Sequence, residues 1–233
     1  MSSGRDIRLG RILGKRGRAG VGACDHGMLA GPHAGMEDIG SMLERVGDGP
    51  DAILLSPGML PHTRGFFARR NAPAVITRLN FNSVLCFHWG YKDSVISNLF
   101  QPEDAVALGA DAVLICLTMK TGSEANDARN AEIFADLCLK AHRIGMPVLG
   151  EYFPHSHTTK DPKDFHEEIL VGCRMLVELG ADFIKTFHTV KFREITSKCR
   201  VPILGLGAEK TPTDLDALKL AERLHVFYTH CRV

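Results

Sequence analysis

Two short sequence patterns alternate along the chain, and this alternation constrains the fold more than any other feature. In the first, Gly is soon followed by Asp and an apolar run; in the second, Pro precedes an apolar run. Short, nearly continuous apolar segments are typical of parallel strands that are buried on both faces. Together with 20–24, the patterns predict seven strands, the first type at 47–55, 109–117 and 180–187 and the second at 73–79, 147–152 and 202–206.

Helical patterns lie between these strands. Residues 126–144 and 163–179 carry apolar side chains at helical spacing, and Gly145 and Gly180 follow them as C-terminal caps. Strands that alternate with helices indicate a parallel α/β fold. The repetition favours a closed (β/α)8 TIM barrel, formed by one domain over residues 1–233, over an open doubly wound sheet. The absence of G-x-G-x-x-G after the first strand also argues against a dinucleotide-binding sheet.

Composition narrows the class of protein further. A chain of 233 residues with 45% hydrophobic and 24% charged residues can form one large core. The net charge of +1 gives no field that would attract nucleic acid or an anionic membrane, and no stretch is apolar enough to span a bilayer. The seven cysteines form no C-x-x-C pair, which favours reduced thiols and a cytoplasmic location. The basic segment 5–18 is interpreted as packing under the barrel or, alternatively, as an interaction arm.

The segment 80–100 fits neither pattern. It precedes a helix predicted at 102–108, and we expect it to be a long loop with a short helix over the barrel mouth. Trp89 within it is expected to be a core or interface aromatic rather than a platform for substrate.

Lys185 is the first candidate catalytic residue. It lies in Phe-Ile-Lys-Thr-Phe, inside a predicted buried strand, and the functional groups of α/β barrels lie at the carboxyl ends of strands. Burial among apolar side chains disfavours the charged ammonium and frees the lone pair of the amine. A neutral amine can attack a ketone carbonyl and form an iminium, which then accepts electrons. The alternative is a lysine that extends from the strand end into solvent.

Two further strand ends carry candidate acid–base groups. Asp25 and His26 follow the first strand, where Asp25 could orient the lysine or transfer a proton, or simply cap a turn. Glu151 and Tyr152 end the fifth strand, and both residue types serve as general acids or bases. His155 and His157 with Glu151 would be the ligands of a metal site, but exposed loop histidines are the preferred interpretation, and we predict no metal or cofactor.

The end of the seventh strand carries a candidate phosphate site. Gly205 and Gly207 suggest a glycine turn, Lys210 lies close by, and Thr211-Pro212 begins a predicted helix. Backbone amides at such a turn and at a helix start suit a phosphate group.

These motifs give the chain a resemblance to a known family. Over about residues 8–223 it resembles the archaeal-type class I fructose-bisphosphate aldolases, within the deoxyribose-phosphate-aldolase-like superfamily. The resemblance implies that Lys185 is the Schiff-base lysine, Asp25 a site carboxylate and Thr186 part of the lysine motif. It also implies a phosphorylated ketose, such as fructose 1,6-bisphosphate, that is cleaved to two carbonyl fragments without metal. The matching motifs are 8–13, Asp25-His26-Gly27, Gly31-Pro32, 109–113, 145–149 and 181–186.

The chain departs from the family at two places. The family often has Tyr directly before Pro after the fifth strand, whereas here Phe153 precedes Pro154 and Tyr152 lies one place earlier. A shift by one residue turns a side chain to the other face of a strand. Three outcomes are then open: a bulge returns Tyr152 to the site, Glu151 or a water takes over its role, or the aldol step is lost. The family also continues into an eighth strand with a Gly-Arg-Asn motif and a last helix. Here 224–228 is apolar enough only for a short closing strand, so the eighth βα unit is expected to be shortened.

The leading interpretation is a class I aldolase for a sugar phosphate. Alternatives are a related Schiff-base lyase or acyltransferase that acts on another phosphorylated keto substrate, and a catalytically impaired homologue that acts by binding. Because a shortened eighth unit would leave strand edges unpaired, we also expect a homo-oligomer.

Overall fold

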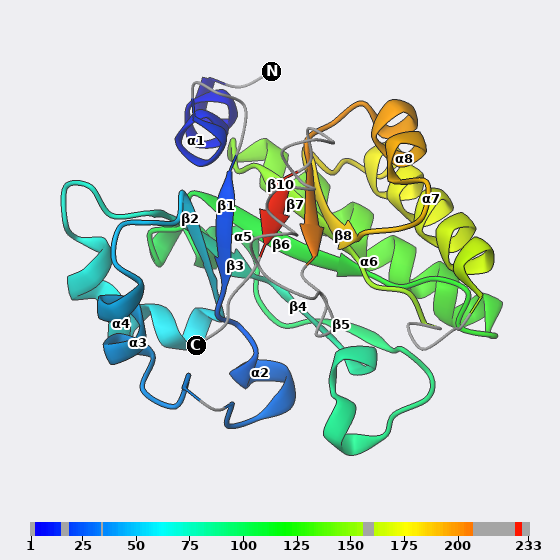
Figure 1. Ribbon diagram of the computed structural model, residues 1–233, viewed down its shortest axis with the longest axis horizontal. Coiled ribbons are helices and arrows are strands. Elements are labelled where there is room, and N and C mark those ends of the chain that lie inside the picture. The colour runs from blue at the N-terminus through cyan, green and yellow to red at the C-terminus, as the bar shows by residue number, and fades with distance from the viewer. Residues whose placement is uncertain (1–2, 15–18, 34, 156–160, 207–226, 230–233) are drawn as a thin grey trace.

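The fold is a closed barrel of eight parallel strands, which confirms the predicted fold class (Figure 1). The structure is a computed structural model that describes residues 3–14, 19–33, 35–155, 161–206 and 227–229. Around the barrel the strands follow the order β1-β10-β9-β8-β7-β6-β3-β2. Their bounds are β1 Gly20–Ala23, β2 Ala52–Leu55, β3 Ala74–Arg78, β6 Ala112–Leu117, β7 Val148–Tyr152, β8 Phe183–Phe187, β9 Ile203–Leu206 and β10 Phe227–Thr229.

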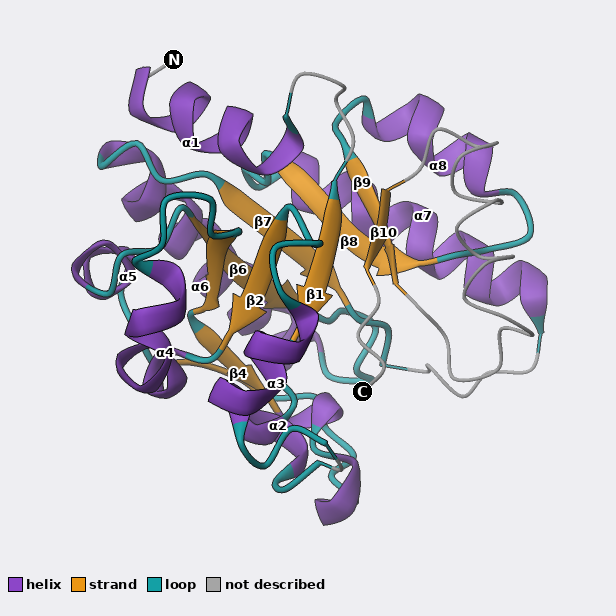
Figure 2. Cartoon of the chain, turned by 60° about the vertical axis from the view of Figure 1, so that its left-hand side comes forward, coloured by secondary structure: helices purple, strands orange, loops and turns teal. Residues whose placement is uncertain are grey.

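The helices lie outside this barrel and around its two ends (Figure 2). The predicted helices at 102–108, 126–144 and 163–179 correspond to α5, α6 and α7. Leu137 of α6 and Ile169 and Leu176 of α7 are completely buried in the apolar layer between helices and sheet. The helices are α1 Ser3–Leu13, α2 Gly27–Ala30, α3 Ile39–Val46, α4 Leu60–Phe67, α5 Pro102–Ala107, α6 Glu124–Arg143, α7 Pro162–Glu178 and α8 Phe192–Cys199, with a 3-10 turn, η1, at Pro57–Met59.

The recurring Asp residues tie neighbouring strands together at the amino end of the barrel. Asp51 accepts a hydrogen bond from the Gly20 amide at 2.7 Å, and Asp111 accepts one from Val75 at 2.9 Å. Asp182 accepts one from Val148 at 2.8 Å. Each carboxylate precedes one strand and holds the start of its neighbour, which gives a structural reason for the repeated pattern.

The basic amino-terminal segment packs against the same end of the barrel. The Arg11 guanidinium lies 2.5 Å from Asp111, and the Arg5 guanidinium lies 3.0 Å from Asp182. Ile12 is fully buried against the apolar side chains that fill the barrel interior. The described part of this segment therefore covers the barrel base, as the first of the two interpretations predicted.

The segment 80–100 differs from the predicted loop. It forms an antiparallel hairpin of β4 (Asn80–Asn82) and β5 (Ile96–Asn98), with the 3-10 turns η2 (Ser83–Leu85) and η3 (Phe87–Trp89) between them. The Asn80 side chain donates to the Cys116 carbonyl and accepts from the Cys116 amide, both at 2.8 Å. An asparagine that pairs like backbone gives no apolar periodicity, so the sequence pattern did not reveal the hairpin. Trp89 is 71% exposed and does not belong to the core.

A short strand closes the barrel at the carboxyl-terminal end of the chain. β10 pairs in parallel with β1 and with β9. It overlaps the closing strand predicted at 224–228, whose first three residues lie outside the described residues. Because β1 and β9 both have a partner strand, the unpaired edges that motivated a homo-oligomer are absent from the described barrel. Association therefore stays a prediction without that support.

None of the helices in the described part of the chain is long and apolar enough to cross a membrane.

Candidate active site

Four ionisable side chains meet inside the barrel at the carboxyl ends of its strands. Asp25 follows β1, Arg78 is the last residue of β3, and Glu151 and Lys185 lie in β7 and β8. Their exposed fractions are 3%, 2%, 2% and 5%. Charged side chains are almost never buried to this extent unless they are paired, so their partners decide what they can do.

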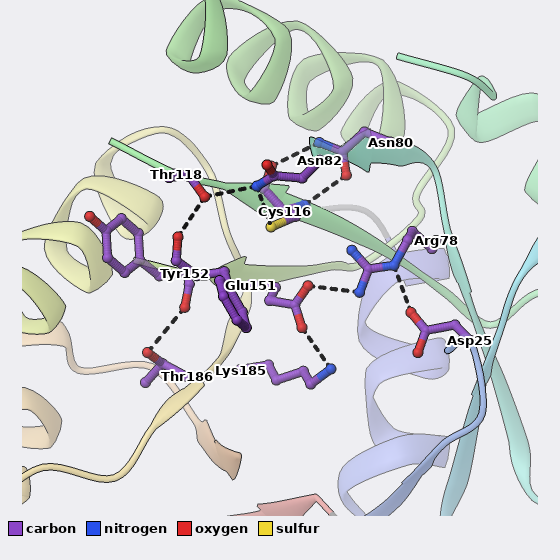
Figure 3. A network of polar contacts seen from close by, with 11 residues as sticks. Asp25, Arg78, Asn80, Asn82, Cys116, Thr118, Glu151, Tyr152, Lys185 and Thr186 are labelled. Carbon is purple, nitrogen blue, oxygen red and sulfur yellow. Dashed lines mark hydrogen bonds and ion pairs between the residues drawn. The ribbon is translucent and has the colours of Figure 1, made fainter. Parts of the chain in front are cut away.

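The four side chains form one continuous chain of ion pairs (Figure 3). Lys185 Nζ lies 2.6 Å from Glu151 Oε1, and the other oxygen of Glu151 accepts from Arg78 Nη2 at 2.7 Å. Arg78 Nε donates to Asp25 Oδ2 at 2.6 Å. Arg78 thus links the two carboxylates that the sequence singled out, and two acids balance two bases.

Strand register brings Glu151 and Lys185 together. The two residues are direct partners in the parallel pairing of β7 with β8, and regular register continues through β6 and β7 up to the pair Leu117 and Tyr152. Side chains of alternate residues point to the same face of a strand, so Glu151 and Lys185 both point into the barrel. The regular pairing contains no bulge that would turn Tyr152 to that face.

The neighbouring charges in this row of ion pairs set the protonation state of Glu151. Burial alone would raise the pKa of its carboxyl group, but the adjacent Arg78 and Lys185 charges lower that pKa to about 2. Burial acts in the same direction on Asp25, where Arg78 and Lys185 again prevail and hold the pKa below its ordinary value. Both groups are carboxylates at neutral pH. The lysine is therefore buried beside a carboxylate, and not among apolar side chains alone as the sequence suggested.

Tyr152 and Thr186 belong to the same two strands, but their side chains lie on the faces opposite to those of Glu151 and Lys185. The Tyr152 ring points away from Glu151 and Lys185 toward α7, where it is 1% exposed (Figure 3). A Cβ atom at Gly172 of α7 would overlap this ring, so the helix approaches the tyrosine closely. Thr186 Oγ1 donates to the Tyr152 carbonyl at 3.4 Å. The structure does not bring these two candidates together with Lys185.

His26 lies at the rim of the ionic cluster. Its ring stacks on His33 with 5.3 Å between ring centroids, and its Nδ1 atom is buried without a hydrogen-bond partner among the described residues. Burial lowers the pKa of His26, and the positive charge of Lys185 lowers it further against the opposing effect of Asp25. The imidazole is therefore neutral near pH 7.

Cys116 is the residue of β6 that pairs with Glu151. Burial, followed by the Glu151 charge, raises the pKa of its thiol to about 12. The thiol stays protonated at neutral pH, which makes it a poor nucleophile compared with a thiolate.

Besides Glu151, the structure describes only His155 and Gly205 among the candidate metal and phosphate residues. His155 Nδ1 is 2.7 Å from Ser94 Oγ, and His157 lies outside the described residues. Within the described ranges no three His, Cys, Asp or Glu side chains are placed to hold a metal ion. Gly205 is paired inside β9 with β8 on one side and β10 on the other, and is not part of a turn. Gly207 and Lys210 lie outside the described residues.

Arg78 is the site residue that the sequence analysis missed. Its strand was predicted from the apolar pattern, but no functional role was predicted for the arginine at the strand end. The signal was the same as for Lys185, a cation within an otherwise apolar buried strand. Its Nη1 atom is buried and has no hydrogen-bond partner in the described part of the chain.

Comparison with known proteins gives a consistent family. The model of the DeoC/LacD family aldolases matches residues 21–220. An uncharacterized aldolase of Saccharolobus solfataricus is 31% identical over 225 residues, which cover 93% of this chain and 81% of the relative. The 2-amino-3,7-dideoxy-D-threo-hept-6-ulosonate synthase 1 of Archaeoglobus fulgidus is 28% identical, over 89% of this chain and 74% of the relative.

A solved structure has the same fold. It belongs to a Schiff-base-forming fructose-1,6-bisphosphate aldolase, and it superposes with a TM-score of 0.75 at 24% identity. The match covers 96% of this chain and 89% of that structure.

Proposed function

Because this chain belongs to the DeoC/LacD family aldolases, we propose that it is a class I aldolase in which Lys185 forms a Schiff base with a phosphorylated ketose such as fructose 1,6-bisphosphate. Asp25 and Arg78 position the reacting groups, and Glu151 transfers protons. The observation that carries this proposal is the buried contact of 2.6 Å between Lys185 Nζ and a Glu151 oxygen.

The first step needs a neutral amine. Glu151 is a carboxylate in contact with Lys185, so it accepts a proton from the ammonium as the substrate carbonyl arrives. The amine then adds to the carbonyl carbon and gives a carbinolamine. Glu151 returns its proton to the carbinolamine oxygen, water leaves, and an iminium remains.

Cleavage of the carbon–carbon bond follows from the iminium. A base removes the proton of the hydroxyl group on the far carbon of the bond that breaks, which becomes the aldehyde carbon. The bonding electrons then move into the iminium and give an enamine. We assign the role of this base to Glu151, because it lies beside the nitrogen of Lys185 and no tyrosine lies on the inner faces of β7 and β8. The released fragment is an aldehyde, and protonation and hydrolysis of the enamine release the other fragment.

Charge balance supports this sequence of steps. The ammonium and the iminium both carry one positive charge, so the ion pair with Glu151 is present before and after Schiff-base formation. Moving uncompensated charge within a buried site is costly, so a reaction that preserves the balance suits these surroundings. Two buried nitrogen atoms that lack partners among the described residues, Arg78 Nη1 and His26 Nδ1, are available for substrate oxygens.

Binding of the substrate phosphate stays a prediction for Gly205, Gly207 and Lys210. Gly205 lies at the carboxyl end of β9, next to the strand that carries Lys185. This is the part of a (β/α)8 barrel that frequently binds phosphate.

A second candidate function is a related Schiff-base lyase or acyltransferase that acts on another phosphorylated keto substrate. The observation that favours it is the outward position of Tyr152, together with Phe153, whose ring packs against that of Phe187 at 5.1 Å. The inner faces of β7 and β8 thus lack the tyrosine used for sugar-phosphate cleavage in the aldolase family that this chain resembles. A homologue that only binds its ligand would also lack it, but would form no iminium.

Borohydride trapping tests the proposal. Reduction in the presence of dihydroxyacetone phosphate should leave a stable adduct on the peptide that holds Lys185, as measured by intact and peptide mass. Lys185→Ala and Lys185→Arg should abolish it, because a guanidinium does not lose its proton in proteins. Lys120→Ala, which removes a lysine with 70% of its side chain exposed, is the matched control and should keep the adduct. An adduct on another lysine would refute the assignment, and no adduct with any phosphorylated ketone would favour a binding homologue.

A further inference from the structure

A cavity at the mouth of the barrel has no role in the steps above. It lies between α2, which follows Asp25, and the hairpin insertion that follows Arg78, and α2 packs against η2 and η3. Its volume is about 740 Å³, within the range of about 300–1,000 Å³ that is typical of small-molecule sites.

The cavity wall is mostly apolar and aromatic, and it also contains His88. Its lining includes Met28, Leu29, Phe81, Trp89 and Tyr91, and none of the described residues that line it is Asp, Glu, Lys or Arg. The rings of Trp89 and Tyr91 are parallel within 8°, and the two residues are 71% and 54% exposed. Large apolar side chains held in the open at the mouth of a site are typical of a surface that binds an apolar ligand.

The cavity lies close to the ionic cluster, although Asp25, Arg78, Glu151 and Lys185 are not among its lining residues. Its α2 wall begins at Gly27, directly after Asp25 and His26. Leu29 and Cys86 of the wall share one apolar cluster with Cys116 and Phe153, which lie at the carboxyl ends of β6 and β7. A molecule in the cavity would therefore lie next to the apolar side chains at the ends of β6 and β7.

Barrel topology separates both walls of the cavity from β9, and β1, which leads into the α2 wall, lies two strands from it. β3, which leads into the insertion, lies four strands from β9 in a barrel of eight, so the two are across the barrel from one another. A substrate whose phosphate binds at the end of β9 and whose carbonyl meets Lys185 on β8 would direct its other end toward the insertion.

From this arrangement we propose that the cavity binds the aldehyde fragment of the aldol reaction and that this fragment has an uncharged, apolar, preferably aromatic body. The inference rests on the proposed function for the identity of the reaction, and it departs from a bisphosphate substrate at this end. A phosphate group here would meet aromatic rings and the imidazole of His88, and would find no lysine or arginine among the described lining residues to neutralise it.

Binding is measured without turnover through Trp89, because it is the only tryptophan in the sequence. Benzyl alcohol resembles an aromatic aldehyde but cannot form an imine with lysine. Titration with benzyl alcohol should change the Trp89 emission to saturation, and glycerol 3-phosphate should not. Tyr91→Ala should weaken the benzyl alcohol affinity about tenfold. Leu99→Ala, which removes an apolar side chain that is 51% exposed and does not line the cavity, should leave it unchanged.

Turnover supplies the second measurement. With the ketone that Lys185 traps as donor, benzaldehyde should have a higher kcat/KM than glyceraldehyde 3-phosphate. Trp89→Ala should raise the KM for benzaldehyde about tenfold and leave the KM for the donor unchanged.

Preference for glyceraldehyde 3-phosphate, a linear response to benzyl alcohol, or an equal effect of Leu99→Ala would overturn the inference. A blue shift of Trp89 emission with rising protein concentration and no response to benzyl alcohol would also overturn it, because a second chain would then cover the wall. Saturable binding without any iminium would leave the cavity assignment standing and refute the proposed function.

Discussion

At the scale of single residues, Glu151 and Tyr152 are adjacent in sequence but serve different parts of the structure. Glu151 contacts Lys185 and Arg78 inside the barrel, whereas Tyr152 packs outside it against α7. We expect Glu151→Gln to lower kcat/KM for the trapped substrate by about 100-fold or more, because the amide accepts no proton. Tyr152→Phe removes only the hydroxyl of the outward residue and should change kcat/KM by less than about twofold. A large loss in Tyr152→Phe with little loss in Glu151→Gln would reverse the two roles.

The low pKa of Glu151 also predicts how stability depends on pH. Its pKa is about 2 in the folded protein against an ordinary value of 4.5, so its contribution is fully present above pH 4.5 and is lost as the pH falls toward 2. When the pH is lowered from about 6 to about 3, the free energy of unfolding should decrease in both proteins. The decrease should be about 2 kcal/mol smaller for Glu151→Gln than for the wild type, because glutamine takes up no proton. Urea unfolding at several pH values measures the difference. Parallel curves for the two proteins would show that Glu151 is not held in its charged form.

At the scale of the elements, an Asp precedes each of three strands, and we expect the stability lost on its replacement to depend on how deeply it is buried. Asp111 is 5% exposed, contacts Arg11 and holds the Val75 amide, whereas Asp51 holds the Gly20 amide in an exposed position. Asp111→Ala leaves a buried donor without a partner and should lower the free energy of unfolding by about 1–3 kcal/mol. Asp51→Ala should cost less than about 1 kcal/mol, because water replaces the lost acceptor. The midpoint of urea unfolding at an unchanged m-value measures both, and equal losses would contradict a role for burial.

The same elements show how far the sequence predicts the fold and the site. The strands of the barrel could be predicted because an element buried on both faces has a continuous apolar pattern, and Lys185 and Glu151 stood out within such patterns. The hairpin of β4 and β5 could not, because Asn80 pairs with Cys116 through its side chain and leaves no apolar alternation. Contact between Arg78, Asp25 and Glu151 depends on the barrel register, which composition and periodicity do not encode. The family resemblance located the lysine, but not the arginine that links the two acids.

At the scale of the whole molecule, the short strand β10 determines whether the barrel is closed. Its pairing with both β1 and β9 leaves neither of those strands with an open edge. Tyr228→Pro removes a ladder hydrogen bond from the middle of this strand and should lower the free energy of unfolding by about 3 kcal/mol or more. Tyr228→Thr keeps the amide and a residue type that favours strands, so it should cost much less. Thermal unfolding and a test for aggregation measure the effect, and equal stability of the two variants would mean that β10 does not hold the barrel closed.

The ion-pair chain of Asp25, Arg78, Glu151 and Lys185 limits how this protein can diverge. Its two acidic and two basic side chains balance one another in an almost fully buried place, so replacing any one of them by an uncharged residue leaves one opposite charge uncompensated in the interior. Descendants that lose Arg78 should therefore also lose an acid, or gain a cation elsewhere in the barrel. Across a set of sequences, the four positions should change together in neutral pairs, and that pattern of joint substitution would distinguish proteins that keep this chemistry from those that have abandoned it.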